Sequence, residues 1–317
     1  MVEKIAIVDI GTYSTRLLIS AVHIKDTLEE TLDSIEDILS VGRITALGRK
    51  LKETGYLQEE AINEVLSTLK EYVLIAREYG VKEIYGYATQ ACREAKNGNE
   101  LLEKIKQLGI DVQLISGEEE AYLSFLATAY GVNPQSDFVV IDQGGGSTEF
   151  VYGQKNNGYQ IKDSVSFPFG IVSLTERFIK SDPPEKEELD NMRQFILQHL
   201  QKIANYSTAQ QFIGLGGTIT TVAALEKHVF PYNSAKVHKT VLSRKAVKKW
   251  LDKLSSMTVE ERKSIPIIED KRAEAIVSGL VIFDTALDFF EKDSITVSDW
   301  GLRHGAVIKK IMEKFNG

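Results

Sequence analysis

One short sequence plan occurs twice in this chain of 317 residues, and the repeat restricts how the chain can fold. Residues 5–15 contain an apolar run that ends in Asp9 and is followed by glycine and hydroxyl residues. Residues 138–150 repeat this plan around Asp142. Each copy is predicted to form a strand, a tight glycine turn and a second strand, because a β-branched run is bounded by turn-forming residues. The copies are much farther apart than the ~20–50 residues of a solenoid repeat, which indicates two similar domains.

Helix and strand signals alternate around the two copies. Apolar residues at helical spacing predict helices over 58–79, 116–130, 246–254, 273–290 and 302–315. A further helix is predicted from Pro183, with Asp182 as its cap, to about residue 204. Apolar stretches predict strands over 82–88, 111–115, 210–213 and 294–297. This alternation favours an α/β fold in which helices cover the sheets.

Composition and charge exclude several classes of protein. Hydrophobic residues make up 43% of the chain and charged residues 26%, which is ordinary for a globular protein. No apolar stretch is long enough to span a membrane and no signal peptide is visible, so a cytoplasmic location is expected. The single cysteine, Cys92, excludes an internal disulfide and a multi-cysteine metal cluster. The net charge of -7 argues against nucleic-acid binding through a basic surface.

Three glycine-rich turns follow predicted strands, at 9–15, 142–149 and 214–218. A single turn of this kind is most often an ordinary hairpin, but a hairpin needs only one or two glycines and residues 144–146 supply three. Consecutive backbone N–H groups at such turns form concavities that bind phosphate oxygens. The candidate phosphate-binding residues of the first two turns are Asp9, Gly11, Thr12, Tyr13, Ser14, Gly144, Gly145, Gly146, Ser147 and Thr148.

Asp9 and Asp142 end the two repeated strands, and each carboxylate has two interpretations. Each could cap its own turn by accepting backbone N–H groups. Alternatively, the two carboxylates could hold Mg²⁺ beside a phosphate chain, directly or through water. For Asp9 alone both interpretations stand, and the equivalent position of Asp142 in the second copy favours metal or water positioning.

Three glutamates, 118–120, open the helix predicted from residue 116. Ser116 and Glu119 form a capping-box pattern, and a first-turn position near the positive end of the helix dipole suits Glu118. Glu120 lacks such a local role. Its neighbours on the helix face are small, which would leave room for a water and a ligand; they lie at 124, 127 and 131. The alternative is that Glu120 is an ordinary solvated glutamate.

Five motifs occur along the chain in a defined order. They are Asp9-Ile-Gly-Thr-Tyr-Ser14, Ala88-Thr-Gln-Ala-Cys-Arg-Glu-Ala95, Ile115-Ser-Gly-Glu-Glu-Glu-Ala121, Asp142-Gln-Gly-Gly-Gly-Ser-Thr-Glu149 and Gly214-Leu-Gly-Gly-Thr218. Their order and spacing resemble those of the exopolyphosphatase / guanosine pentaphosphate phosphohydrolase (Ppx/GppA) family. The resemblance extends through Arg272-Ala273 and Ser298-Asp-Trp-Gly-Leu-Arg-His-Gly305, so it covers essentially the whole chain. Each motif alone is modest, whereas the ordered set is highly specific.

The resemblance implies membership of the actin / sugar kinase / heat-shock 70 ATPase superfamily, which agrees with the internal repeat. That fold has two ribonuclease-H-like domains with mixed sheets flanked by helices, and an interdomain cleft that closes on a phosphate chain. Residues 1–124 with about 300–317 would form the first actin-like domain, and residues 125–299 the second.

The resemblance also implies roles for single residues. The family's catalytic glutamate falls on Glu120, and its metal- and water-positioning acids fall on Asp142 and Glu149, with Asp9 as a further candidate metal ligand. Arg93, on a predicted strand-to-helix turn, is the best-placed arginine for phosphate. The third turn lies where the superfamily contacts a nucleotide, and the candidates there are Gly214, Gly216, Gly217, Thr218 and Arg272.

Four other arginines are weaker candidates for phosphate binding, because surface or ion-pair roles explain them better; they are Arg16, Arg43, Arg272 and Arg303. The activity implied by the resemblance is removal of the terminal phosphate from inorganic polyphosphate or guanosine pentaphosphate. Mg²⁺ or another divalent cation would be the cofactor, with K⁺ as a second candidate. Guanosine tetraphosphate is a further candidate ligand, and homodimers occur among relatives.

Two alternatives to this activity remain open. One is an ATP-dependent kinase or ATPase of the same superfamily. The other is a non-catalytic sensor of guanosine phosphates, which would be expected to lack one of the acids at positions 120, 142 and 149. Longer family members carry an additional C-terminal region, so weak processivity on long polyphosphate is expected of a chain that stops at Gly317.

Overall fold

The chain forms two compact units in a computed structural model that describes residues 2–156 and 158–316. One unit contains the residues up to Tyr130 together with the segment from Leu302 onward, and the other runs from Gly131 to Gly301. The sequence predicted boundaries at 124/125 and near 300, and the first of these lies within helix α6 (Gly117–Gly131). Each unit has its own sheet and core.

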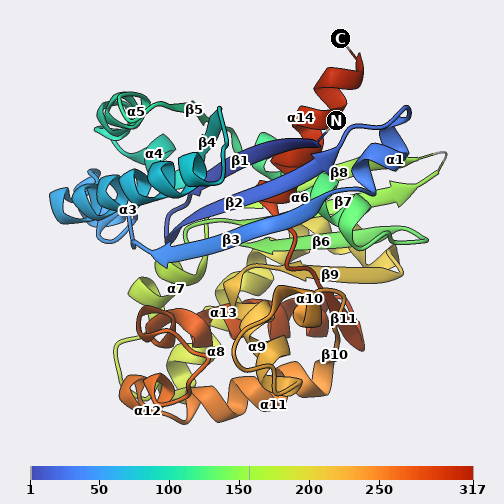
Figure 1. The fold of residues 1–317 in the computed structure, drawn as a ribbon. Helices are drawn as coiled ribbons and strands as arrows, with labels where there is room; N and C mark the ends of the chain where they lie inside the picture. The colour runs from blue at the N-terminus through green and yellow to red at the C-terminus, as the bar shows by residue number, and fades with distance from the viewer. Residues whose placement is uncertain (1, 157, 317) are drawn as a thin grey trace. The chain divides into compact units, whose positions relative to one another are not determined.

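The first unit is built on a five-stranded mixed sheet in the order β3-β2-β1-β4-β5 (Figure 1). Strand β2 pairs antiparallel with β1 and with β3, whereas β1, β4 and β5 run parallel. The strands are β1 (Val2–Ile10), β2 (Ser14–His23), β3 (Glu36–Ile44), β4 (Ile84–Ala88) and β5 (Ile110–Leu114). The helices are α1 (Leu28–Leu32), α2 (Leu51–Thr54), α3 (Glu59–Glu78), α4 (Gln90–Glu94), α5 (Gly98–Lys106), α6 and α14 (Leu302–Asn316).

The apolar run of β1 explains why this strand lies at the centre of the sheet. Residues 5–8 are all buried, as expected of a strand that is covered on both faces. Helix α3 places Ile62, Val65 and Leu69, which follow helical spacing, in the same core cluster as Val8. The packed sheet therefore holds the loops at its edges in fixed positions.

The second unit is built on a six-stranded mixed sheet in the order β10-β11-β9-β6-β7-β8. Strands β6, β9 and β11 run parallel, and β7, β8 and β10 are antiparallel to their neighbours. The strands are β6 (Phe138–Gln143), β7 (Thr148–Lys155), β8 (Tyr159–Phe167), β9 (Gln211–Leu215), β10 (Val241–Ser243) and β11 (Ser294–Val297). The helices are α7 (Ile171–Phe178), α8 (Lys186–Leu200), η1 (Gln201–Thr208, a 3₁₀ helix), α9 (Gly217–Glu226), α10 (Ser234–Val237), α11 (Arg244–Ser255), α12 (Val259–Lys263) and α13 (Asp270–Phe289).

The predicted α/β fold with two mixed sheets flanked by helices is confirmed. Long periodic segments were predicted well: the five helices expected from helical spacing correspond to α3, α6, α11, α13 and α14. The four strands expected from apolar stretches correspond to β4, β5, β9 and β11. In both copies of the repeated plan the structure has a strand, a turn and an antiparallel strand.

The helix expected from Pro183 was predicted wrongly at its start. Helix α8 begins at Lys186, because the Glu188 carboxylate accepts the backbone N–H of Glu185 (2.9 Å) in a capping box. Asp182 does not cap α8. Its carboxylate instead accepts the backbone N–H of Val259 (2.9 Å) at the start of α12.

Two features noted in the composition, the single cysteine and the lack of a membrane-spanning apolar stretch, are placed by the structure. Cys92 is buried, and burial raises the pKa of its thiol to about 12, which suits a packing role. Across the part of the chain that the structure describes, no helix has both the length and the apolar character that crossing a membrane requires.

Candidate active site

Parallel strands bring three predicted segments to one edge of the first unit's sheet. Ile10, Ala88 and Leu114, near the carboxyl ends of β1, β4 and β5, lie in register. The backbone N–H of Thr89 binds the carbonyl oxygen of Ile10 (3.2 Å) just beyond this register. The β1–β2 turn, helix α4 and the start of α6 therefore all leave from the carboxyl edge, where ligands bind in open α/β sheets.

The β1–β2 turn is held through its carbonyl oxygens. The N–H of Gly11 closes the turn on the carbonyl oxygen of Ser14 (3.0 Å). The carbonyl oxygens of Thr12 and Tyr13 accept backbone N–H groups from residues 45–48 at 2.8 to 3.1 Å. The N–H of Thr12 has no acceptor within the described ranges, so it is available for an anion.

Arg93 and Glu120 lie together at this edge. The Arg93 guanidinium donates to the carbonyl oxygen of Ile115 (2.5 Å), and its Nη1 is 4.0 Å from Oε2 of Glu120. Their side chains are 30% and 12% exposed. The Glu120 carboxylate is thus neither solvated like a surface glutamate nor cut off from solvent, and it has a positive charge beside it.

The local roles assigned to the neighbouring glutamates agree with the structure. The hydroxyl of Ser116 accepts the N–H of Glu119 (3.1 Å), as the capping pattern predicted. Glu119 also pairs with Lys309 of α14 (3.2 Å), and Glu118 is exposed. Glu120 is therefore the first-turn glutamate whose carboxylate turns toward Arg93.

The prediction of an open space along the small residues below Glu120 was wrong. Ser124 and Ala127 are fully buried, so they mark close packing. A Cβ on Gly131 would lie 2.7 Å from the Trp300 ring, so glycine is needed there to admit the indole.

The second unit places two acids opposite each other at the base of a hairpin. Asp142 ends β6 and is the direct antiparallel partner of Glu149 on β7. Side chains of directly opposed residues lie on the same face of a sheet. Glu149 is only 1% exposed, and its Oε1 accepts the hydroxyl of Ser166 on β8 (2.6 Å). Because like charges so placed repel, this pair suits a site that binds a cation.

The β6–β7 turn between these acids repeats the design of the first turn. The N–H of Gly144 closes the turn on the carbonyl oxygen of Ser147 (3.0 Å). The carbonyl oxygens of Gly144 and Gly145 accept the N–H groups of residues 171–172, at the start of α7. In the chain that the structure describes, the N–H groups of Gly145, Gly146 and Ser147 have no acceptor.

The third turn leaves the same edge of the second sheet, because Asp142 lies in register with Leu215. Gly216 has a positive φ of 106°, and a Cβ there would meet the carbonyl oxygen of Gln143 at 2.5 Å. A Cβ on Gly217 would lie 1.8 Å from Nη1 of Arg272, so the guanidinium rests on this glycine. Arg272 also pairs with Glu269 (3.1 Å).

Two candidates at this turn, Gly214 and Thr218, are buried and closely packed. Gly214 is buried, and a Cβ there would lie 2.8 Å from Ile295. The Thr218 hydroxyl is buried beside Gly279 of α13, since a Cβ on Gly279 would lie 2.2 Å from it. The Thr218 side chain therefore packs against α13.

Three residues that hold the turns in their own units were not predicted from the sequence. Gly48 packs on Thr12, and a Cβ on Gly48 would lie 2.3 Å from the Thr12 methyl carbon. Gly170 packs on the backbone of Gly145, and a Cβ on Gly170 would lie 2.5 Å from the Gly145 carbonyl carbon. The Gln143 amide donates to the carbonyl oxygen of Gly279 (2.7 Å) and ties β6 to α13. Only Gln143 had a sequence signal, because it follows Asp142 directly.

The weaker arginine candidates have structural partners. Arg43 pairs with both carboxylate oxygens of Glu71 (2.7 and 3.2 Å). Arg303 is buried and donates to the carbonyl oxygen of Leu17 (2.8 Å). Arg16 lies near the first turn, where its Nε donates to the Ser14 hydroxyl (3.1 Å).

The proposed metal ligands can be judged by their chemistry. Within residues 2–156 and 158–316, no three side chains of His, Cys, Asp or Glu gather as a metal-binding cluster. Asp9 belongs to the first unit, and Asp142 and Glu149 to the second. The opposed pair Asp142–Glu149 fits Mg²⁺, which is commonly held by one or two carboxylates and completes its shell with water and substrate phosphates.

The sequence matches the Ppx/GppA phosphatase family over residues 24–314. It is 30% identical to a bifunctional 3-dehydroquinate synthase/phosphatase of Fusobacterium nucleatum over 98% of this chain and 47% of that protein, so the chain spans about half the length of this relative. It is 29% identical to exopolyphosphatase 2 of Mycobacterium tuberculosis, over 96% of this chain and 98% of that one. The crystal structure of the Aquifex aeolicus member of the Ppx/GppA family is similar over 99% of both chains, with 42% identity and a TM-score of 0.83.

Proposed function

The chain belongs to the Ppx/GppA phosphatase family, and we propose on this basis that it hydrolyses phosphoanhydride bonds. The substrate would be inorganic polyphosphate or guanosine pentaphosphate, and the terminal phosphate would be released. The observation that carries the proposal is the β6–β7 turn, where N–H groups without acceptors in the described chain stand beside the Asp142–Glu149 pair. Such N–H groups favour phosphate oxygens, and the acids suit a divalent cation.

The first unit would supply the base for the reaction. Hydrolysis of a phosphoanhydride depends on positioning and charge neutralisation more than on covalent chemistry. Glu120 would accept a proton from the water that attacks the terminal phosphorus, as the bridging P–O bond breaks. Arg93, 4.0 Å from Glu120, would offset negative charge on the phosphate oxygens. Mg²⁺ held by Asp142 and Glu149 would neutralise further oxygen charge.

Polyphosphate is the better-supported substrate. Exopolyphosphatase 2 of Mycobacterium tuberculosis is similar over 96% of this chain and 98% of its own length, so the likeness is not confined to one part of either protein. Guanosine pentaphosphate would need contacts to its base and ribose. The third turn, with Arg272 over Gly217, is the candidate for those contacts.

A phosphate-release assay tests the proposal and separates it from the kinase alternative. The purified protein is incubated with polyphosphate and Mg²⁺ in the absence of ATP, and inorganic phosphate is measured over time. The proposal predicts steady release that EDTA abolishes. A parallel reaction with guanosine pentaphosphate ranks the two substrates. A protein that releases phosphate from neither substrate, but transfers it from ATP to an acceptor, would contradict the proposal.

A further inference from the structure

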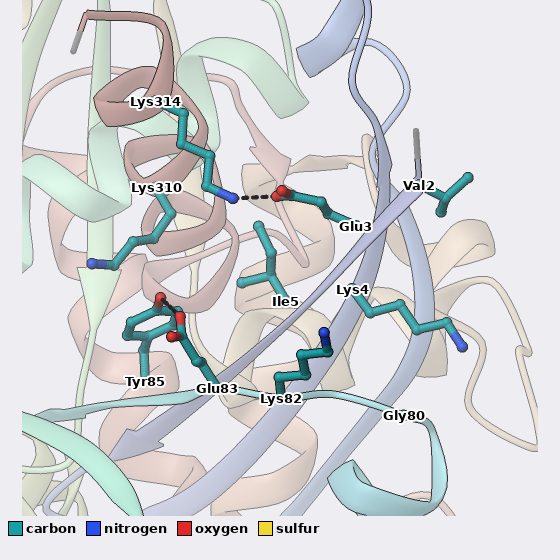
Figure 2. A pocket seen from close by; sticks show the side chains of 10 residues that line it. All are labelled: Val2, Glu3, Lys4, Ile5, Gly80, Lys82, Glu83, Tyr85, Lys310 and Lys314. Carbon is teal, nitrogen blue, oxygen red and sulfur yellow. Dashed lines mark hydrogen bonds and ion pairs between the residues drawn. The ribbon is translucent and has the colours of Figure 1, made fainter.

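A groove of about 540 Å³ opens on the first unit, away from the β1–β2 turn (Figure 2). Its lining comes from the amino end of β1, from the segment that leads into β4, and from helix α14. Strand β1 runs from this groove to the turn at Gly11. At about 3.3 Å per strand residue, Lys4 in the groove lies roughly 20 Å from Gly11, so the groove is separate from the candidate active site.

Lysine side chains dominate the groove. Four lysines line it against two glutamates, and these six residues are Lys4, Lys82, Lys310, Lys314, Glu3 and Glu83. This local excess of positive charge runs against the net charge of -7 of the whole chain. An anion is therefore the ligand that the lining favours.

Both glutamates in the groove are already engaged. Glu3 forms an ion pair with Lys314, and Glu83 accepts the hydroxyl of Tyr85 (2.5 Å), as the dashed lines in Figure 2 show. The hydrogen bond to Glu83 raises the pKa of Tyr85 to about 12, so the phenol keeps its proton and donates it in the hydrogen bond to the Glu83 carboxylate. The ammonium of Lys82 has no partner in the part of the chain that the structure describes.

The other ammonium groups keep donors for a ligand. Lys4 spends one of its three N–H donors on the carbonyl oxygen of Tyr79 (2.8 Å). Lys310 lies 4.3 Å from the centre of the Tyr85 ring, which holds its chain along the wall of the groove, and its ammonium also pairs with Glu313 (3.4 Å) one turn along α14. Figure 2 shows Ile5 between the lysines of α14 and Lys82. Cations thus flank an apolar floor on two sides.

We propose that this groove is a second binding site for condensed phosphate, which holds a part of a long polyphosphate chain remote from the bond being cleaved. Lysine ammonium groups are compact point charges that bind phosphate oxygens, and several of them along one groove match a ligand with repeated charges. The inference rests on the proposed function for the identity of the ligand. A tripolyphosphate is too short to contact both the groove and the β1–β2 turn, whereas a long chain is not.

A pair of matched variants tests this site. The groove variant carries Lys82→Gln with Lys310→Gln. The control carries Lys70→Gln with Lys104→Gln, which removes the same charge from exposed positions of α3 and α5 in the same unit. Kinetics are measured on long-chain polyphosphate and on tripolyphosphate, and binding of labelled long-chain polyphosphate is followed by fluorescence anisotropy at two salt concentrations.

The groove variant is expected to raise the KM and the dissociation constant for long-chain polyphosphate about tenfold, with an effect that shrinks at high salt. Its kinetics on tripolyphosphate should equal those of the control. Equal binding of the long chain by the groove and control variants would overturn the inference while leaving the hydrolase proposal intact. Displacement of the labelled chain by polyglutamate as readily as by polyphosphate would also overturn it.

Failure of the proposed function gives a different result. In that case no variant, nor the unmodified protein, releases phosphate from either substrate. A loss of long-chain binding confined to the groove variant would then still support the groove as a phosphate site.

Discussion

The β1–β2 turn and the β6–β7 turn follow one plan but are secured differently. In both, the first glycine N–H closes the turn and the carbonyl oxygens are held by a neighbouring segment. The first turn carries side chains at Thr12 and Tyr13, whereas the second has Gly145 and Gly146 at the corresponding positions. The second turn therefore presents more bare N–H groups to a ligand.

The segments that hold the two turns also differ in how closely they approach. Gly48 contacts the methyl group of Thr12, which is a side-chain atom. Gly170 contacts the carbonyl group of Gly145, which is backbone. The first turn can adjust by moving a side chain, and the second cannot. We infer that the second turn is the more rigid of the two proposed phosphate-binding turns, and that the first unit would contribute mainly through Arg93 and Glu120.

The largest expected effect comes from removing the proposed base of the first unit. Glu120→Gln keeps the size of the side chain but loses the proton acceptor, so kcat for phosphate release should fall by ~10²–10⁴-fold. KM should change little, because the turns are intact. Glu118→Gln, two residues before Glu120 and exposed, is the matched control and should retain full activity. Near-normal turnover by a folded Glu120→Gln protein would remove Glu120 from this role.

The next effect tests the difference between the turns directly. Gly170→Ala places a methyl group 2.5 Å from the backbone of Gly145 and must displace the turn. Because a misplacement of about 1 Å can reduce rates ~10²-fold, kcat/KM should fall by about that factor. Gly48→Ala should cost only a few-fold, since the Thr12 side chain can give way. If Gly48→Ala proved the more damaging of two folded variants, the comparison would be reversed.

A smaller effect is expected from removing the hydrogen bond that positions Glu149, one of the two acids beside the β6–β7 turn. Ser166→Ala removes the hydroxyl that donates to Glu149 (2.6 Å). A hydrogen bond to a charged group contributes ~1.5–3 kcal/mol, so the Mg²⁺ concentration for half-maximal activity should rise about tenfold or more. Ser164→Ala, on the same strand and face, is the control. An unchanged Mg²⁺ dependence in Ser166→Ala would mean that Glu149 needs no such positioning.

The smallest effect concerns the stability of the first unit, which is completed by a helix from the far end of the chain. The first unit depends on α14, whose buried His304 lies 2.9 Å from the Asp37 carboxylate of β3. Asp37→Asn should lower the free energy of unfolding by ~1–3 kcal/mol in urea titrations near neutral pH. Asp33→Asn, at an exposed position of the same unit, should have little effect.

The direction in which pH changes the stability difference between the unmodified protein and Asp37→Asn can also be predicted. Burial acts to raise the pKa of Asp37, but its hydrogen bond with His304 and the nearby positive charges outweigh burial, so the pKa lies below its usual value. A lowered pKa in the folded state stabilises the fold above the unfolded-state pKa of about 3.9 and is lost as the pH falls through the folded value. The gap between the unmodified protein and Asp37→Asn should therefore narrow below about pH 4. A gap that widens in acid would contradict this assignment.

Local sequence signals predicted the long helices, several strands and the turns that carry the candidate residues, because strands, turns and capping patterns depend on near neighbours. The Asp142–Glu149 pairing follows from the hairpin itself. Contacts between distant segments were not predictable in this way. Gly48 and Gly170 are needed only because other segments approach them closely, and Asp182 was misassigned because its partner, Val259, is far along the chain.

The central claim is that bare N–H groups of the β6–β7 turn hold phosphate, and glycine-selective NMR measures this directly. Tripolyphosphate is titrated into protein labelled with ¹⁵N-glycine, and the amide signals are followed. The signals of Gly145 and Gly146 should shift first and most. The amide of Gly144 should shift less, because its N–H already donates a hydrogen bond to the carbonyl oxygen of Ser147. Unmoved Gly145 and Gly146 signals at substrate concentrations that support full phosphate release would contradict the account.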